Sequence, residues 1–222
     1  GSVWLDGGAT SRSVIAWSPN SVTTDGHDWV HRGRALSARG CCIGYIGFGA
    51  GHRVAPVPAE ASTPEPEVWL AHYDSALTWS PGGGWGTIGQ ARSADAADLL
   101  ARAVELAPPV AASTSGPRHT TSRQAYEAGV RQIVEWTDAG DCYQVNLTRP
   151  VFVENAGAPW PAYRRLRGAS DAEHGAFLRL REDLSILSNS PELLLEAQGR
   201  RVVSSPIKGT RPRHEDPVQD EQ

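Results

Sequence analysis

Short apolar segments separated by turn residues fill the first third of the chain. Gly, Pro, Asp or Ser bound each segment, which is typical of β-strands joined by turns. The segments are residues 3–5, 13–17, 41–47 and 68–73. The proline-rich residues 55–66 and the Gly82-Gly83-Gly84 sequence are expected to form surface loops. The pattern predicts a β-rich meander.

The patterning becomes helical towards the middle of the chain. Residues 94–106 have the alanine and leucine content of a helix. Residues 107–120 are rich in Pro, Ser and Thr and are the best candidate for a linker. Thr121-Ser122-Arg123-Gln124 then has the spacing of a capping box. Apolar residues repeat at helical intervals after it, until Gly140. These repeating residues are Tyr126, Val130, Ile133, Val134 and Thr137. A helix over residues 122–138 follows.

Residues 141–148 alternate between apolar and polar side chains, which predicts a strand. Tyr143, Gln144 and Asn146 either line a pocket there or face a core. A short helix is expected over residues 160–167. Further strands are predicted with tight turns between them. These strands are residues 176–180, 184–188, 193–197 and 201–205.

The predicted fold class is α+β, with mostly antiparallel sheets packed by helices. We divide the chain into a β-rich region over residues 1–106, the linker over 107–120 and a second region over 121–210. Residues 211–222 are charged and polar without periodicity, and are expected to form a mobile tail.

Composition limits the classes of function. The chain has 222 residues and a net charge of -4, with its arginines scattered rather than clustered, which argues against a nucleic-acid partner. No segment approaches the roughly 20 apolar residues that span a bilayer. Residues 1–10 lack the basic start and apolar run of a secretion signal, so a cytoplasmic protein is expected. The three cysteines show no disulfide framework or zinc-ligand spacing.

Lys208 is the one lysine among 21 basic residues. Arginine cannot give up its proton in a protein, whereas a partly desolvated lysine can become a neutral nucleophilic amine. Lys208 also lies between Pro206 and Gly209. Pro206 stiffens the chain that leads to Lys208, and Gly209 lets the backbone come close to a ligand. Either the chemistry requires this amine, or one lysine survived by chance on a surface turn.

Three sequence blocks stand out together. They are Gly140-Asp141-Cys142-Tyr143-Gln144-Val145-Asn146-Leu147, Ser190-Pro191-Glu192 and Pro206-Ile207-Lys208-Gly209-Thr210-Arg211-Pro212. In this order and spacing they resemble the chorismate-utilising enzymes, the family that includes anthranilate, aminodeoxychorismate, isochorismate and salicylate synthases. Weaker matches are Trp4-Leu5-Asp6-Gly7-Gly8, Gly44-Tyr45-Ile46-Gly47-Phe48 and Tyr73-Asp74. The Pro-Ile-Lys-Gly-Thr form is similar to the aminodeoxychorismate synthase branch, because anthranilate synthases usually carry alanine in place of Lys208. The resemblance implies a sandwich like that of anthranilate synthase component I, here incomplete.

The resemblance also implies a mechanism and a partner. The Lys208 amine would add to C2 of chorismate as the C4 hydroxyl leaves, with Glu192 as general acid and base, and Gly209 and Thr210 would bind substrate. Ammonia from a glutamine amidotransferase subunit would then replace the lysine and give 4-amino-4-deoxychorismate, a precursor of p-aminobenzoate and folate. Family members are about twice as long, and their later part supplies the ligands of Mg²⁺. Little activity is therefore expected from this chain alone.

Two alternatives remain at this stage. The chain could belong to an anthranilate synthase component I or another chorismate-using enzyme, or it could be a non-catalytic module that binds tryptophan or docks a partner. The early block of the family helps to form a tryptophan pocket. Gly7 stands here where a serine is typical, and Glu173-His174-Gly175 replaces a Pro-Phe-Ser-like stretch, which argues against tryptophan binding.

Overall fold

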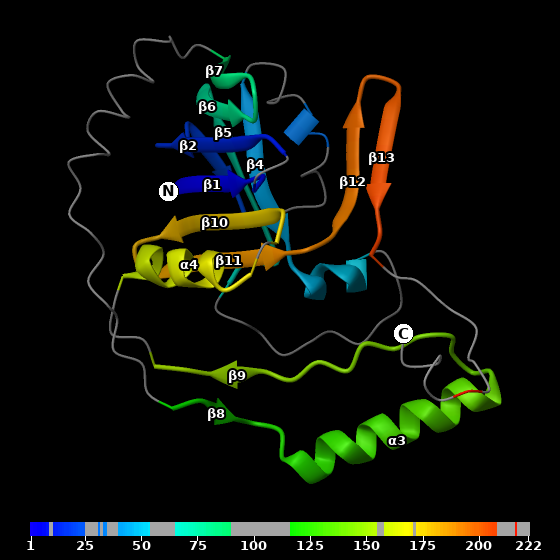
Figure 1. Ribbon diagram of the computed structural model, residues 1–222. Helices are drawn as coiled ribbons and strands as arrows, with labels where there is room; N and C mark the ends of the chain where they lie inside the picture. Colours follow the sequence, from blue (N-terminus) through cyan, green and yellow to red (C-terminus); the bar gives the residue numbers. More distant parts are fainter. Residues whose placement is uncertain are drawn as a thin grey trace. The chain divides into compact units, whose positions relative to one another are not determined.

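The computed structural model describes residues 1–8, 11–24, 31, 33–34, 40–53, 65–89, 116–154, 158–170, 172–207 and 216 (Figure 1). The chain forms two compact units. Unit 1 combines Gly1–Pro108 with Tyr163–Gln222, and unit 2 is Pro109–Ala162. The predicted helix over 94–106, most of the loop over 55–66 and nearly all of the tail over 211–222 lie outside the described residues.

Unit 1 is built on a six-stranded antiparallel sheet that joins the two ends of the chain. Its strands, in spatial order, are β11 (Leu184–Ser190), β10 (His174–Arg181), β1 (Ser2–Asp6), β2 (Ser13–Trp17), β6 (Ser75–Ser80) and β7 (Gly84–Gly89). Trp4 of β1 pairs with Phe177 of β10 on one side and with Ile15 of β2 on the other. Gly82 and Gly84 adopt positive φ angles of 73° and 68° in the turn that joins β6 to β7, a conformation that suits glycine. Strands from both predicted regions therefore share one sheet.

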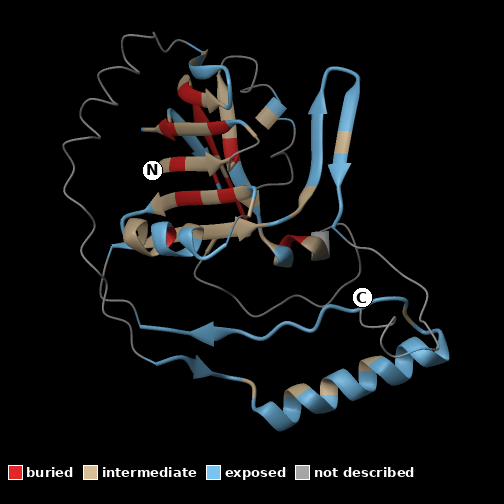
Figure 2. Ribbon diagram, in the orientation of Figure 1, coloured by how far each residue is buried: buried red, intermediate tan, exposed pale blue. Residues whose placement is uncertain are grey.

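A smaller sheet packs against the first and closes the core. It contains β3 (Ser21–Thr23), β5 (Val68–Tyr73) and β4 (Cys41–Ile46), in that order, and the 3-10 helix η1 (Phe48–Arg53) follows β4. Apolar side chains from both sheets form one buried cluster, as expected for two sheets packed face to face. The cluster comprises Val3, Ala16, Ile43, Trp69, Ala71, Tyr73, Ala76 and Leu178. Figure 2 shows these buried positions concentrated on the strands of the two sheets.

The helix α4 (Pro159–Gly168) packs against β1 and β10 through Tyr163. The Tyr163 side chain is fully buried, and its ring centroid lies 6.2 Å from that of Trp4 and 5.7 Å from that of Phe177. Trp4 and Phe177 are directly paired across the two strands, so Tyr163 lies over a cross-strand aromatic pair. This contact attaches the second half of the chain to the first.

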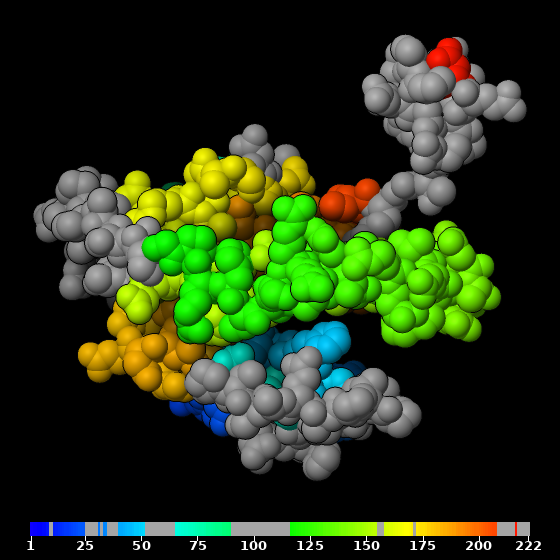
Figure 3. Space-filling view, turned by 90° about the horizontal axis from the view of Figure 1, so that it is seen from below, coloured from blue at the N-terminus to red at the C-terminus, as the bar shows by residue number. Residues whose placement is uncertain are grey.

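The described residues of unit 2 include a two-stranded ladder and a long helix, α3. Strands β8 (Arg118–His119) and β9 (Val151–Phe152) pair antiparallel, and α3 (Arg123–Ala139) lies between them in the sequence. The Ser122 hydroxyl caps the helix by accepting a hydrogen bond from Ala125 N–H at 3.1 Å, and Gly140 ends it in the left-handed conformation with φ 82°. Residues 116–154, coloured green to yellow-green, form an elongated body in Figure 3. No residue of this fully described helix is buried.

The hairpin near the C-terminal end of the chain is a second exposed element. Strands β12 (Leu193–Gln198) and β13 (Arg201–Ser205) form a hairpin of their own, outside the two packed sheets. Figure 2 shows most of this hairpin as exposed. Leu194, Leu195 and Val202 are 86%, 60% and 61% exposed. An isolated two-stranded hairpin with a bare apolar face is only marginally stable, so this one presents surface that further packing would stabilise.

Most of the predicted elements are confirmed. The strands expected over 13–17, 68–73 and 201–205 coincide with β2, β5 and β13, and the helices expected over 122–138 and 160–167 correspond to α3 and α4. No described helix is long and apolar enough to cross a membrane. The three cysteines are free thiols.

The strand predicted over 141–148 is wrong, because this segment has no regular structure. A strand needs a neighbour to accept and donate its backbone hydrogen bonds, and none of the described strands pairs with it. The segment lies along α3 instead. The Tyr126 hydroxyl donates a hydrogen bond to Leu147 C=O at 3.4 Å. The Leu147 side chain lies against Gly129, since a Cβ added to Gly129 would be only 3.0 Å from Leu147 Cδ2. Tyr143, one of the pocket candidates, is 89% exposed.

Candidate functional site

Ser190 is the last residue of β11, and Pro191 and Glu192 form the turn between β11 and β12. The Ser190 hydroxyl accepts a hydrogen bond from Glu192 N–H at 3.3 Å and donates to Glu192 C=O at 3.1 Å. Glu192 is half-buried. A serine hydroxyl that bonds both backbone groups of one residue holds that residue in a defined turn, so the position of Glu192 is coupled to the end of β11.

The hairpin places Glu192 near the described residues that precede Lys208 in the sequence. Leu193, which follows Glu192, is paired with Ser205 of β13. Ser205 is three residues before Lys208 in the sequence, and the described chain continues from it to Ile207, which is 63% exposed. Lys208, Gly209 and Thr210 themselves lie outside the described residues. Glu192 and the segment that leads to Lys208 therefore leave the hairpin at neighbouring positions.

Arg167 forms a part-buried ion pair next to this turn. Its Nε lies 2.7 Å from Asp6 Oδ2, and the two side chains are 19% and 16% exposed. The same guanidinium donates to Ala172 C=O and, at 2.9 Å, to Asn189 Oδ1. Arg167 comes from α4, Asp6 from the end of β1 and Asn189 from the end of β11. One planar cation thus joins three elements that are far apart in the sequence.

Gly175 makes room for this arrangement. It is buried on β10 directly opposite Asp6. A Cβ at this position would lie 2.6 Å from the Tyr163 hydroxyl oxygen and 3.0 Å from Arg167 Cδ, which is closer than side chains pack. Burial, with the Asp6 carboxylate adding to it, raises the pKa of Tyr163 to about 12. The tyrosine therefore stays neutral at physiological pH, and the ionic contact at this site is the one between Asp6 and Arg167.

Gly7 in the early block is required by close backbone packing. A Cβ there would lie 2.5 Å from Ser11 C and 2.6 Å from Arg12 O. Its N–H donates to Ser13 Oγ at 3.1 Å. A side chain at position 7 therefore does not fit this backbone conformation.

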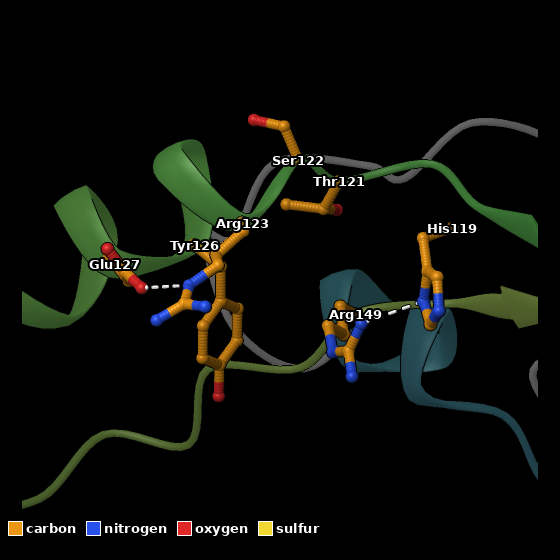
Figure 4. Close-up of a pocket in the computed structure, with 7 residues that line it drawn as sticks. All are labelled: His119, Thr121, Ser122, Arg123, Tyr126, Glu127 and Arg149. Atoms are coloured by element: carbon orange, nitrogen blue, oxygen red, sulfur yellow. Dashed lines mark hydrogen bonds and ion pairs between the residues drawn. The ribbon is translucent and has the colours of Figure 1, made fainter.

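Unit 2 has a hollow of its own, which the sequence did not indicate. It measures about 720 Å³ and lies beside the start of α3 (Figure 4). Arg149 Nη1 lies 2.8 Å from His119 Nδ1, and its guanidinium carbon is 5.9 Å from the centre of the Tyr126 ring. Arg123 pairs with Glu127 at 2.6 Å across the hollow's rim. The lining is largely polar and exposed, and its cationic groups already have partners on the protein.

The described residues do not form a magnesium site. Magnesium is held by carboxylate and other oxygen ligands in an octahedral arrangement. Among the residues that the structure describes, no three His, Cys, Asp or Glu side chains are close enough together to hold a metal ion.

Sequence reasoning identified Glu192 and its turn but not the residues that support it. Arg167 and Asp6 are separated by 161 positions, and Asn189 lies one residue before the recognised Ser-Pro-Glu block. No local pattern distinguishes Arg167 from the neighbouring arginines 164 and 165. Asp6 and Asn189 are brought together because both pair with Gly175 of β10, from its two sides.

The chain is similar in sequence to known proteins. The family model described as chorismate binding enzyme matches residues 5–222. Aminodeoxychorismate synthase component 1 of Klebsiella aerogenes is 35% identical over 192 residues, which cover 82% of this chain and 41% of the relative. Anthranilate synthase component 1 of Aeropyrum pernix is 38% identical over 108 residues, 49% of this chain and 24% of the relative. The chain thus spans about two fifths of the length of the first of these relatives.

The fold has a solved counterpart. The crystal structure of anthranilate synthase component I from Streptococcus pneumoniae superposes with a TM-score of 0.70 at 19% sequence identity, covering 86% of this chain and 52% of the other. This likeness confirms the predicted α+β fold with mostly antiparallel sheets. Together with the family match over nearly the whole sequence, it leads to one conclusion: the chain belongs to the family of chorismate binding enzymes.

Proposed function

We propose that this chain is part of an aminodeoxychorismate synthase component I, which replaces the C4 hydroxyl of chorismate with ammonia. The single lysine in Pro206-Ile207-Lys208-Gly209-Thr210 carries this proposal, because a neutral lysine amine can act as a nucleophile and an alanine cannot. The similarity to the Klebsiella aerogenes component 1 over 82% of the chain supports it.

The proposed reaction proceeds by two successive substitutions. The Lys208 amine forms a bond to C2 of chorismate, the ring double bonds shift, and the C4–O bond breaks as Glu192 donates a proton to the departing hydroxyl, which leaves as water. Ammonia then forms a bond to C4, the double bonds shift back, and the C2–N bond to Lys208 breaks. Glu192 takes up a proton from the incoming nitrogen. The sum is chorismate plus ammonia giving 4-amino-4-deoxychorismate plus water.

The geometry supports the pairing of these two residues. Glu192 precedes Leu193, and Leu193 pairs with Ser205, from which the chain leads to Lys208. A nucleophile that acts at C2 and an acid that acts at C4 of one ring must both reach that ring, so the segments that carry them must lie near each other. The register of the hairpin is compatible with this requirement.

We further propose that turnover requires polypeptide beyond these residues, with the Mg²⁺ ligands among it. The chain spans 41% of the Klebsiella aerogenes relative, and no described cluster is suited to a metal ion. The exposed apolar side chains of the hairpin and of α3 also indicate surfaces that normally pack against something. Ammonia would come from a separate glutamine amidotransferase subunit.

A trapping experiment tests the chemistry of Lys208. The complete polypeptide is incubated with chorismate and magnesium but without ammonium, and the mass of the intact protein is measured by mass spectrometry. We expect an adduct of chorismate less water, located on Lys208 by peptide mapping and discharged by added ammonium. Lys208→Arg keeps the positive charge but has no neutral amine, so it should form no adduct and no aminated product. Full amination by Lys208→Arg would rule the proposal out.

Anthranilate synthase is the second candidate, and the match to the Aeropyrum pernix component 1 favours it. It would make 2-aminobenzoate from the same substrate without a covalent lysine. Product identification separates the two reactions, because anthranilate and 4-amino-4-deoxychorismate differ in mass and in fluorescence.

A further inference from the structure

The Asp6–Arg167 ion pair has features that core stability does not explain. Both side chains are largely withdrawn from water, at 16% and 19% exposure. Removing two charges from water carries a desolvation cost that their attraction often fails to exceed, so a buried pair is weak support for a purely stabilising role. The Arg167 guanidinium also reaches beyond its partner, to Ala172 C=O and Asn189 Oδ1.

Both the oxygen and the nitrogen of the Asn189 side-chain amide form hydrogen bonds here. Its Oδ1 accepts from Arg167 at 2.9 Å, and its Nδ2 donates to Leu166 C=O at 3.1 Å and to Ser170 Oγ at 2.7 Å. An amide with one acceptor and two donors, all engaged, has its orientation fixed. Since Asn189 also pairs with Gly175 in the sheet, both its backbone and its side chain are held.

The contacts continue from Asn189 to Glu192. Ser190 follows Asn189 directly, and its hydroxyl bonds both the N–H and the C=O of Glu192. Asp6, Arg167, Asn189, Ser190 and Glu192 thus form an unbroken series of bonded or adjacent residues. A tilt of Asn189 would be transmitted to the turn within two residues, because no flexible glycine lies between them.

We propose that Arg167 and Asn189 are positioning residues that hold the Ser190-Pro191-Glu192 turn, and through it the Glu192 carboxylate, where it meets the substrate. This inference rests on the proposed role of Glu192 in the reaction. Asp6 has the supporting part of neutralising and orienting the guanidinium. A displacement of about 1 Å at a reacting group can cost about 100-fold in rate, so fixing this turn has a direct catalytic effect.

The same β10–β11 hairpin offers a matched control at its other end. Arg181 Nε lies 2.7 Å from Asp183 Oδ1, the same separation as in the Asp6–Arg167 pair. The Arg181 and Asp183 side chains are 49% and 72% exposed, and the pair lies at the turn away from Glu192. Arg181→Lys therefore makes the same chemical change as Arg167→Lys on the same hairpin without touching the proposed series of contacts.

Hydrogen exchange tests the structural half of the proposal in this chain, independently of activity. Arg167→Lys keeps a cation for Asp6 but loses the fork that also reaches Ala172 and Asn189. We expect the Glu192 amide to exchange at least about tenfold faster, as for loss of a hydrogen bond to a charged group. Urea unfolding midpoints should stay close to wild type, and Arg181→Lys should leave the Glu192 amide unchanged.

Asn189→Ala is the second variant, since it removes the link without altering any charge. It should make the Glu192 amide hydrogen exchange faster, as Arg167→Lys does. Uniformly faster exchange across the whole sheet, with no excess at Glu192, would assign the cluster a purely structural role and overturn the proposal. Unchanged exchange at Glu192 in both variants would overturn it as well.

Kinetics in the complete polypeptide test the catalytic half. Arg167→Lys should lower kcat for chorismate amination by about 10- to 100-fold and leave KM within about twofold, because the turn positions an acid and does not bind substrate. Glu192→Gln is measured alongside. If Glu192→Gln abolishes amination while Arg167→Lys leaves kcat unchanged, the positioning role is wrong and the proposed function stands. If Glu192→Gln has no effect, the proposed role of Glu192 is wrong, whatever the exchange data show.

Discussion

Tyr163 fastens α4 to the large sheet, and replacing it measures how much that contact contributes. Its side chain is 1% exposed, and its ring lies over the Trp4–Phe177 pair at centroid distances of 6.2 and 5.7 Å. Tyr163→Ala removes the ring and leaves a cavity between the helix and the strands. The surrounding backbone belongs to a regular sheet, so it cannot collapse to fill the space.

The expected loss follows from the buried area. An aromatic side chain buries about 150–250 Å². At about 25 cal/mol per Å² this corresponds to about 4–6 kcal/mol. That figure is an upper bound, because unfolded chains are more compact than extended ones. Aromatic-to-alanine changes in protein cores cost about 3–5 kcal/mol. We therefore expect Tyr163→Ala to lower the free energy of unfolding by about 3–5 kcal/mol.

Urea denaturation, followed in parallel by tryptophan fluorescence and circular dichroism, measures this loss. Tyr143→Ala is the matched control, because Tyr143 is 89% exposed and the same atoms are removed. The control should change the free energy of unfolding by less than about 0.5 kcal/mol. If Tyr163→Ala does not fold, Tyr163→Leu should fold with a smaller loss. A free energy of unfolding within about 1 kcal/mol of wild type for Tyr163→Ala, with an unchanged m-value, would refute the packing of α4 described here.

Three further predictions concern Tyr163, Gly175 and Ser122. Tyrosine titrates near pH 10 when unfolded, and burial raises the pKa of Tyr163 to about 12, so the folded state holds this proton more tightly. Stability is then full below about pH 10 and falls as pH rises towards 12; urea midpoints across the alkaline range should show a smaller fall for Tyr163→Phe. Gly175→Ala places a methyl group 3.0 Å from Arg167 Cδ and should lower the unfolding free energy by about 1–3 kcal/mol, measured by urea denaturation, whereas no change would contradict the close approach. Ser122→Ala removes the cap of α3 at a cost of about 1 kcal/mol, so the first-turn amides should exchange about fivefold faster while those near Gly140 do not.

Local patterns in the sequence predicted individual elements well. The strands β2, β5 and β13 have the predicted bounds, and Ser122 and Gly140 delimit α3 because their cap geometries depend only on neighbouring backbone. Such features are set by interactions within a few residues, which the sequence displays directly.

Pairing between distant segments could not be predicted in the same way. The alternation over 141–148 suggested a strand, but no described strand lies beside it, so the segment lies along α3. The contact of Arg167 with Asp6 depends on β10 lying next to β1, which the residues of neither strand specify. The motif identified Glu192 as a candidate, whereas the side chains that hold its turn became visible only in three dimensions.

The product made from chorismate is the most direct test of the proposed function. The complete polypeptide and this chain are incubated in parallel with chorismate, magnesium and nitrogen-15 ammonium, and the products are identified by chromatography and mass spectrometry. We predict labelled 4-amino-4-deoxychorismate from the complete polypeptide, none from this chain alone and none from Lys208→Ala. Anthranilate or isochorismate as the product, or full amination by Lys208→Ala, would contradict the assignment.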